Sequence, residues 1–252
     1  MPISDTLIAD EGPSAPSPAG IAGGHPLDNA VLAALLGPHA RLAERRGDVL
    51  RYPADVSPFV ALPDQADEAH WQDLADLLEP GAAAVVTGDR RTPPPHWEVV
   101  MNGSGVQLVD DGVAAAPDHE AVPLGRADVP EMLDLVARAQ PGPFLPRTIE
   151  LGSYLGIRRG GVLVAMAGER LHPPGWTEIS AVCTAEEYRG QGLATRLVHA
   201  VAHGIRERGE TPFLHAAANN TNAIRLYESL GFRLRRETNF LAVRAPGGSP
   251  RE

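Results

Sequence analysis

The most informative stretch of this chain is Arg189-Gly190-Gln191-Gly192-Leu193-Ala194. It lies between an apolar segment, residues 177–184, and a long helical pattern that begins near Gln191. A glycine-rich turn from a strand into a helix leaves backbone N–H groups free at the helix start, where the helix dipole adds partial positive charge. Such a turn binds phosphate, and an arginine at its entrance adds a full charge. A glycine pair that only tightens the turn is the alternative interpretation.

The composition is typical of a soluble globular protein, with 43% hydrophobic and 21% charged residues in a chain of 252. No apolar run approaches the roughly 18 residues of a membrane-spanning helix. Residues 1–24 have neither the basic flank nor the apolar core of a secretory signal. The single cysteine, Cys183, excludes an internal disulfide framework. These observations predict a cytoplasmic protein without membrane contact.

The charge is unevenly spread along the chain. Residues 1–120 hold 6 Arg and 19 acidic residues, a net charge of −13, whereas residues 121–252 hold 16 Arg and 13 acidic residues, a net charge of +3. The acidic half argues against nucleic-acid binding by the whole chain. An anionic ligand is expected on the second half.

The chain divides into two compact regions, residues 25–118 and 121–245, joined by a linker. The segments 1–24 and 246–252 are expected to be flexible tails, because they contain too few apolar residues to offset the entropy lost on ordering. In the first region the apolar pattern predicts helices near residues 27–36, with Asp28 as a cap, and near residues 71–78. Strands are predicted over residues 49–52, 59–62, 84–86 and 97–101, and Asn102-Gly103 is typical of a hairpin turn.

The second region has the stronger pattern. It predicts helices over residues 129–136, 191–205 and 222–230, with Gly231 ending the last helix. Strands are predicted near residue 122 and over residues 154–158, 161–167, 177–184, 213–216 and 232–243.

Residues 121–245 resemble the GNAT superfamily of acyl-CoA-dependent N-acyltransferases in two motifs. Residues 189–194 fit the family's pyrophosphate loop, Gln/Arg-x-x-Gly-x-Gly/Ala. Residues 220–232, Asn-Thr-Asn-Ala-Ile-Arg-Leu-Tyr-Glu-Ser-Leu-Gly-Phe, are similar to its closing motif, Asn-x-x-Ala-x-x-Leu-Tyr-x-x-x-Gly-Phe. The resemblance implies an α/β (α+β) fold with a mixed, mostly antiparallel twisted sheet flanked by helices. The first region is then an N-terminal α/β domain of unknown role, with a degenerate second copy of the same fold as one alternative.

The resemblance also implies a co-substrate, acetyl-CoA, and a primary amine as acceptor. In the family, the strand before the loop pairs with the pantetheine arm, the loop amides hold the pyrophosphate, and an asparagine contacts CoA. Asn220 as a plain helix cap is compatible with that role. The residues implied to contact acetyl-CoA are Val182, Cys183, Thr184, Arg189, Gly190, Gln191, Gly192, Leu193, Ala194 and Asn220.

Two residues are predicted to be catalytic. Tyr227 matches the family's tyrosine that protonates the CoA thiolate, with a core aromatic as the alternative. Glu178 lies on the strand beside the acyl group, at the spacing of the glutamate base in the histone-acetylating branch. Strand alternation predicts Glu178, Ser180 and Val182 on one face and Ile179, Ala181 and Cys183 on the other. A partly apolar cleft would raise the pKa of Glu178 and suit it as a base.

Other arrangements for the base stay open. Glu169 and His172 are fallback candidates, many family members use ordered water alone, and Glu178 could equally be a solvated strand charge or a substrate-binding carboxylate. Arg147 and Glu150, within residues 142–154, lie where the family builds its acceptor wall.

Neither a cysteine nucleophile nor a metal is expected. The family attacks the thioester directly, and the predicted strand face places Cys183 among apolar residues. His199 and His203 are four apart on a helix, but the glutamate that a zinc-protease motif requires is absent, so a solvated helix face is expected.

Three functional classes follow from these observations. The leading one is an acetyltransferase acting on a small amine, an amino acid, an antibiotic or a protein N-terminus. The second is a sensor that binds acyl-CoA without turnover, against which Glu178, Tyr227 and the Arg189 loop argue together. The third makes the acidic first region a domain that binds basic partners. Family members are often dimers, and nothing in the sequence decides the oligomeric state.

Overall fold

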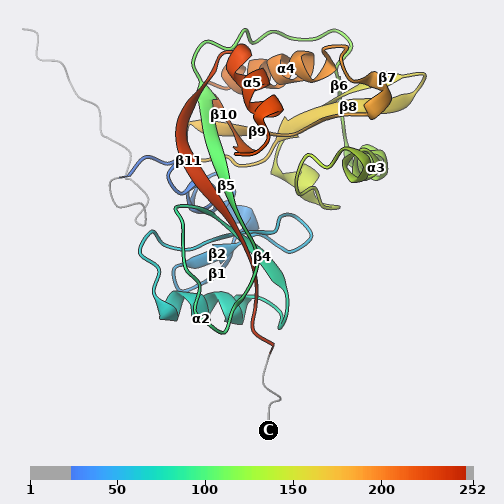
Figure 1. The fold of residues 1–252 in the computed structure, drawn as a ribbon. Helices are drawn as coiled ribbons and strands as arrows, with labels where there is room; N and C mark the ends of the chain where they lie inside the picture. Colours follow the sequence, from blue (N-terminus) through green and yellow to red (C-terminus); the bar gives the residue numbers. More distant parts are fainter. Residues whose placement is uncertain (1–23, 248–252) are drawn as a thin grey trace, which may run out of the picture.

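A computed structural model describes residues 24–247 (Figure 1), so the predicted flexible tails lie almost wholly outside the described residues. Within that range one continuous sheet has the strand order β1-β2-β3-β4-β11-β5-β10-β9-β8-β7-β6. Neighbouring strands are antiparallel, apart from the parallel pairs β3–β4 and β9–β10. The expected mixed, mostly antiparallel sheet flanked by helices is confirmed. No helix between residues 24 and 247 combines the length and apolarity needed to cross a membrane.

The first half of the chain supplies five strands and two helices. They are α1 (Ala30–Leu36), β1 (Glu44–Arg46), β2 (Val49–Arg51), β3 (Phe59–Ala61), α2 (Glu68–Leu77), β4 (Ala83–Gly88) and β5 (Glu98–Asp110). The predicted cap of α1 is wrong by one residue, because the Asn29 side chain accepts the Leu32 N–H. Asp28 instead accepts hydrogen bonds from Arg235 and Arg236.

The predicted hairpin turn at Asn102-Gly103 is also wrong. β5 continues straight through it, with Asn102 opposite Leu241 and Gly103 opposite Phe240 on β11. Turn propensity is a local preference, and a long antiparallel partner overrides it. A glycine is required two residues later, because the Phe240 ring occupies the space where a side chain at Gly105 would begin.

The second half follows the predicted order of elements closely. It consists of β6 (Val122–Pro123), α3 (Val129–Ala139), β7 (Tyr154–Arg159), β8 (Val162–Glu169), β9 (Trp176–Thr184), α4 (Leu193–Glu207), β10 (Thr211–Ala217), α5 (Thr221–Ser229) and β11 (Phe232–Arg244). Gly231 adopts a φ of +97°, as expected for the residue that ends α5.

The two halves repeat one arrangement of elements. In each, three antiparallel strands (β1–β3 and β7–β9) lead through a helix (α2 or α4) to a strand parallel to the third (β4 or β10). This repetition supports the interpretation of the first half as a degenerate copy. The segment between β3 and α2 contains no glycine, so the first half lacks the glycine turn that precedes α4 in the second.

The last strands of the two copies are exchanged. β5 from the first half pairs with β10 of the second, and β11 from the second half pairs with β4 of the first. β5 and β11 also pair with each other at the centre, where they run between the upper and lower parts of the molecule in Figure 1. The predicted boundary near residues 118–121 therefore separates two segments that share one sheet.

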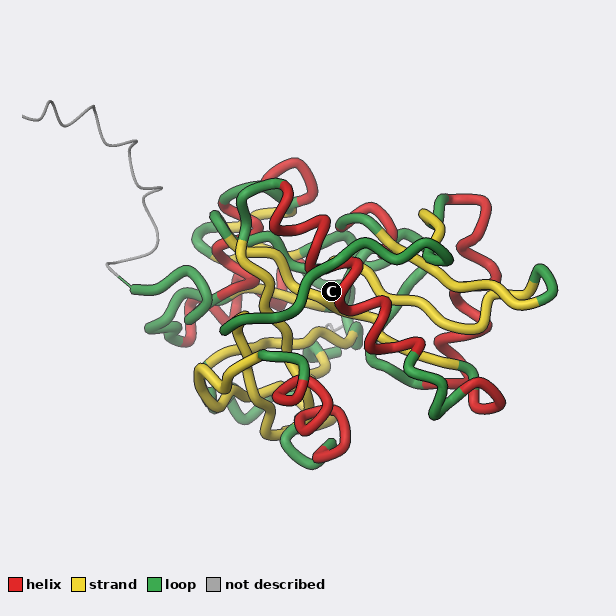
Figure 2. The backbone as a smooth tube through the Cα atoms, turned by 90° about the horizontal axis from the view of Figure 1, so that it is seen from above, coloured by secondary structure: helices red, strands yellow, loops and turns green. Residues whose placement is uncertain are grey.

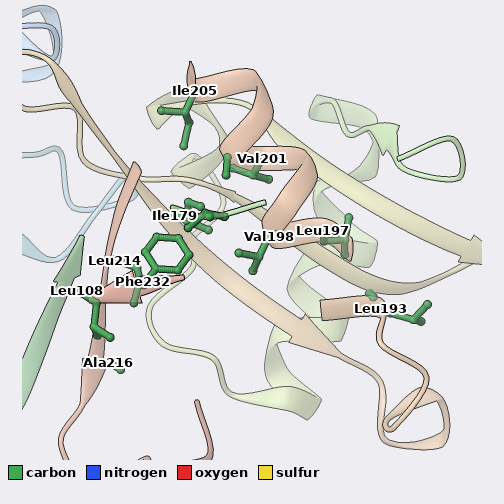
Figure 3. Close-up of a cluster of buried hydrophobic side chains, with 14 of the residues drawn as sticks. Leu108, Ile179, Leu193, Leu197, Val198, Val201, Ile205, Leu214, Ala216 and Phe232 are labelled. Carbon is green, nitrogen blue, oxygen red and sulfur yellow. The ribbon is translucent and has the colours of Figure 1, made fainter. Parts of the chain in front are cut away.

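Helices cover both faces of the sheet, as the view from above shows (Figure 2). In the second half, α4 packs Leu197, Val201 and Ile205 against Ile179 and Phe232 on one face (Figure 3). α3 packs Met132 and Leu135 against the opposite face of β8 and β9. These two cores hold β9 and the start of α4 in place. The loop that joins β9 to α4 is thereby positioned as well.

Candidate functional site

The loop before α4 has the geometry that its glycines predict. Gly190 and Gly192 have φ angles of +76° and +73°, and no atom lies within 4 Å of where a side chain would start on either residue. Gly192 is the N-cap of α4 and no side chain caps the helix. The N–H groups of the first turn therefore remain available to an anion. Leu193 is 2% exposed and anchors the helix start in the core.

The sheet opens beside this loop. β9 and β10 pair only between residues 176–178 and 211–213, and the two strands separate beyond Glu178. The edge of β9 that faces β10 is therefore unpaired over Val182, Cys183 and Thr184, the segment expected to hold the pantetheine arm.

A β-bulge corrects the predicted alternation of β9. Ala181 has a φ of +53°, and the register between β8 and β9 shifts between Met166 and Gly168. As a result Ile179 packs under α4, while Ala181 and Cys183 both pack on the α3 side. The prediction that these three residues share one face is wrong, because a bulge inserts one extra residue and reverses the alternation after it. The reversal also turns the Val182 side chain into the opening.

A cavity of about 740 Å³ lies at this opening, and we call it the β9–β10 cavity. It joins residues from both halves of the chain. Its walls are formed by Phe59, Val85, Met101, Gly103, Ser104, Gln140, Pro141, Gly142, Pro143, Arg170, Val182, His215, Ala216, Ala217, Ala218, Asn219, Asn220, Ala223, Tyr227 and Phe240.

Tyr227 and Asn220 both line this cavity, as the second motif predicts. The Asn220 side chain accepts the Ala223 N–H at 3.1 Å and caps α5. The Tyr227 ring packs edge-on against Phe232, with ring centroids 6.2 Å apart. Burial raises the pKa of Tyr227 to about 12, and Cys183 adds to that rise, so the phenol keeps its proton across the neutral range. Tyr227 can therefore act as a proton donor at the cavity wall.

The surroundings of Glu178 differ from those that were predicted. Its side chain is fully buried and accepts two hydrogen bonds from Arg170, at 2.8 and 2.5 Å. The remaining contact is with His215 Nδ1, at 2.7 Å. Burial opposes ionisation, but Arg170 and His215 outweigh it and lower the pKa of Glu178 to about 2. The expected rise in this pKa is wrong, because the predicted apolar cleft is in fact a buried ion pair.

His215 is held by a chain of polar side chains. Gln107 Nε2 lies 3.0 Å from His215 Nε2 and also donates to the Leu27 carbonyl, at 2.9 Å. Arg235 donates to the Gln107 carbonyl oxygen and to Asp28. With Gln107 donating to Nε2, the proton of His215 sits on Nδ1 and is donated to Glu178. Both nitrogens of the ring are therefore engaged inside the protein.

The fallback candidates for the base lie elsewhere. Glu169 accepts the Ser153 N–H and pairs with Arg208 at 2.9 Å, and it lines a separate cavity of about 670 Å³. Burial lowers the pKa of His172, whose ring lies 4.9 Å from that of His39. Neither residue lines the β9–β10 cavity.

Of the segment expected to form the acceptor wall, only Gly142 and Pro143 line the β9–β10 cavity. Arg147 pairs with Glu150 and Asp55 outside it. Cys183 is 6% exposed, and burial raises its pKa to about 12. Between residues 24 and 247, no three or more His, Cys, Asp or Glu side chains gather in a group that could hold a metal ion.

Sequence reasoning missed the contribution of the first half to this cavity. Phe59, Val85 and Met101 come from three strands that carry no motif, and Arg170 and His215 stand outside both family motifs. The predicted strands containing Phe59 and Val85 were a partial signal, but their place beside Tyr227 depends on the exchange of β5 and β11.

Comparisons with known proteins identify the family of this chain. The family model described as FR47-like protein matches residues 154–241. N-alpha-acetyltransferase RimI of Mycobacterium tuberculosis (strain ATCC 25618 / H37Rv) is 34% identical over 129 residues, covering 46% of this chain and 80% of that protein. Mycothiol acetyltransferase of Corynebacterium glutamicum (strain R) is 36% identical over 74 residues, which are 29% of this chain and 25% of that protein.

A solved structure from Novosphingobium aromaticivorans DSM 12444, described as an acetyltransferase from the GNAT family, is similar to this chain over both halves. The TM-score is 0.81 at 40% sequence identity, and the match covers 90% of this chain and all of the other. The arrangement of strands and helices in both halves is therefore shared with that protein.

Proposed function

Because this chain belongs to the GNAT family of acetyltransferases, we propose that it transfers an acetyl group from acetyl-CoA to a primary amine. The observations that carry the proposal are the β9–β10 cavity with Tyr227 in its wall, the unpaired edge of β9 and the free N–H groups at the start of α4. The proposed path of acetyl-CoA runs from the cavity along this edge to the start of α4, with Tyr227 as the proposed acid and the loop as the proposed anion site.

The residues along the path fit the parts of acetyl-CoA. The backbone of Val182, Cys183 and Thr184 offers an open strand edge, which suits the amides of a pantetheine arm. The loop at residues 189–194 offers N–H groups, a helix dipole and the Arg189 side chain to the pyrophosphate. Acetyl-CoA supplies a thioester carbonyl that an amine can attack.

Tyr227 is proposed as the general acid. Attack by the amine forms an N–C bond and breaks the C–S bond, so the sulfur leaves with an electron pair and needs a proton. The Tyr227 hydroxyl lines the cavity and holds its proton at neutral pH, which suits that role. Asn220 holds the start of the helix that carries Tyr227.

Glu178 remains the candidate for the general base. In this proposal it accepts the proton that the amine loses through a water molecule. Both of its oxygens already accept hydrogen bonds, and its side chain has no exposed surface. These contacts favour an ionised carboxylate that orients Arg170 and His215 over direct contact with the amine. If Glu178 is the base, Glu178→Gln binds acetyl-CoA normally and loses most turnover at neutral pH. Full turnover in a folded variant would remove it from the mechanism.

The first test is thermal unfolding with and without acetyl-CoA. A ligand at about 100 times its Kd adds roughly 2.7 kcal/mol of stability. For a chain of this size that corresponds to a rise in Tm of about 5–10 °C. Gly192→Asp places a negative charge at the anion site and is expected to abolish the shift.

Gly160→Asp is the matched control, because Gly160 also has a positive φ (+56°) and open space around it, but lies in the turn between β7 and β8. Its acetyl-CoA shift is expected to equal that of the wild type. No shift in the wild type contradicts the proposal. A shift without thiol release for any amine supports instead the alternative of a non-catalytic acyl-CoA sensor.

A further inference from the structure

The acceptor end of the β9–β10 cavity has an apolar floor built mainly by the first half of the chain. Phe59 is on β3, Val85 on β4 and Met101 on β5. Together with Ala242 of β11, which lies between β4 and β5, they form a single row across the sheet. The register pairs Phe59 with Val85, Val85 with Ala242, and Ala242 with Met101. Residues in one such row project from the same face of a sheet. Phe240, on β11, lies beside this row and lines the same cavity. We call Phe59, Val85, Met101 and Phe240 the apolar floor.

The wall of the cavity carries a positive charge and no negative one. Arg170 is the one side chain among the lining residues that carries a permanent charge, and no carboxylate lines the cavity. Polycationic acceptors such as polyamines would therefore meet a guanidinium and find no acidic partner. Glu178 lies behind Arg170 with no exposed surface, so its charge is already matched.

Arg170 has donor capacity left for a ligand. Its Nε and Nη2 atoms donate to Glu178, and its guanidinium lies 4.8 Å from the centre of the Phe59 ring. In the described part of the chain, no hydrogen bond joins Nη1 to an acceptor. The Arg170 side chain is 11% exposed and lines the cavity beside the apolar floor. A carbonyl or carboxylate oxygen close to an apolar group would complete its set of partners.

We propose that the acceptor is an α-amino compound with an apolar side chain, in which the floor binds the side chain and Arg170 binds the neighbouring carbonyl or carboxylate oxygen. This inference rests on the proposed acetyltransferase function and names its substrate class. The shared chemistry is found in a free apolar amino acid and in the N-terminal residue of a peptide. In both, the carbon that bears the primary amine also bears the apolar side chain and the carbonyl carbon.

The test compares amines by thiol release from acetyl-CoA. Leucine, leucinamide, a Leu-initiated tripeptide, glycinamide and spermidine are used at equal concentrations with the full chain. At least one leucine compound is expected to exceed both glycinamide and spermidine about tenfold or more in kcat/KM, because a buried apolar group discriminates by roughly 10–200-fold. Free leucine as the best substrate identifies an amino acid acceptor, and the tripeptide as the best identifies a peptide N-terminus. Spermidine as the best substrate overturns the inference.

Variants at the floor separate binding from folding. Met101→Asp places a carboxylate on the floor at a residue that is 48% exposed, and Leu234→Asp makes the same change at a residue of β11 that is 46% exposed and does not line the cavity. Met101→Asp is expected to raise KM for the best leucine compound about tenfold or more with kcat nearly unchanged, and to reduce the preference for that compound over glycinamide. Leu234→Asp should leave both constants as in the wild type.

Calorimetric titration of leucinamide or leucine into the protein saturated with CoA gives a readout without turnover. We expect the wild type and Leu234→Asp to bind the ligand with the same affinity. We expect the affinity of Met101→Asp to be about tenfold weaker. Equal affinities in all three proteins overturn the inference. An acetyl-CoA shift with no preference among the amines overturns it while the transferase function stands, whereas the absence of an acetyl-CoA shift removes both.

Discussion

Replacing Glu178 by Gln tests the buried ion pair that the site is built around. The variant leaves Arg170, which is 11% exposed, without the carboxylate that it contacts through two hydrogen bonds. Removing one partner of a buried pair costs about 3–5 kcal/mol, because the other charge stays out of water uncompensated. At roughly 2–4 °C per kcal/mol, Tm should fall by about 6–20 °C.

The pH dependence of stability gives the same test a second readout. The pKa of Glu178 is lowered from 4.5 to about 2 on folding, so its contribution is present above pH 4.5 and is lost as the pH falls through 2. That contribution is on the order of 3 kcal/mol. The wild type should therefore lose more stability than Glu178→Gln between pH 4.5 and 2.

Urea unfolding at pH 7 and at several acidic pH values measures both effects. Glu98→Gln is the control, because the Glu98 side chain is 63% exposed in its pair with Arg244 and should contribute no more than about 1 kcal/mol. The double variant Arg170→Met, Glu178→Leu should recover part of the loss, since an apolar pair needs no counter-charge. If Glu178→Gln unfolds within 1 kcal/mol of the wild type and keeps its acid sensitivity, the reasoning about the buried pair is refuted.

Three further outcomes are expected. Tyr227→Phe should lower kcat by roughly 10²-fold with little change in KM for acetyl-CoA, measured by steady-state thiol release; an unchanged kcat would return Tyr227 to a packing role. Gly105→Ala should destabilise the chain by about 1–3 kcal/mol in urea, because its methyl group meets the Phe240 ring, whereas Gly103→Ala, with no atom within 4 Å, should not. A fragment of residues 121–252 lacks β5, which lies between β10 and β11, and should not fold cooperatively by circular dichroism, whereas a cooperative transition would restore the two-domain division.

The local elements of the second half could be read directly from the sequence. The strand, glycine turn and helix around residues 189–194, the stripe of apolar residues on α4 and the αL position of Gly231 are all encoded within a few residues of where they act. Helix and strand periodicity depends on neighbours along the chain, so a linear pattern is sufficient to predict it. The two motifs also identified Tyr227 and Asn220, which the fold brings to one cavity.

The remaining features depend on residues that are far apart in the sequence. Asn102-Gly103 is a turn signal by local propensity, and only its pairing with residues 240–241 makes it part of a strand. The pKa of Glu178 is set by His215, on another strand, together with Arg170, and no pattern around Glu178 predicts those contacts. The bulge at Ala181 reverses a strand face that alternation alone assigned wrongly.

Short-range patterns in the chain were therefore sufficient to predict the family fold, the glycine turn before α4 and the motif that carries Tyr227. Only the tertiary structure decided that the first half of the chain forms the floor of the same cavity. The exchange of β5 and β11 places Phe59, Val85 and Met101 beside residues more than one hundred positions away. Such proximity is set by strand pairing across the whole sheet, which depends on the summed packing of both halves.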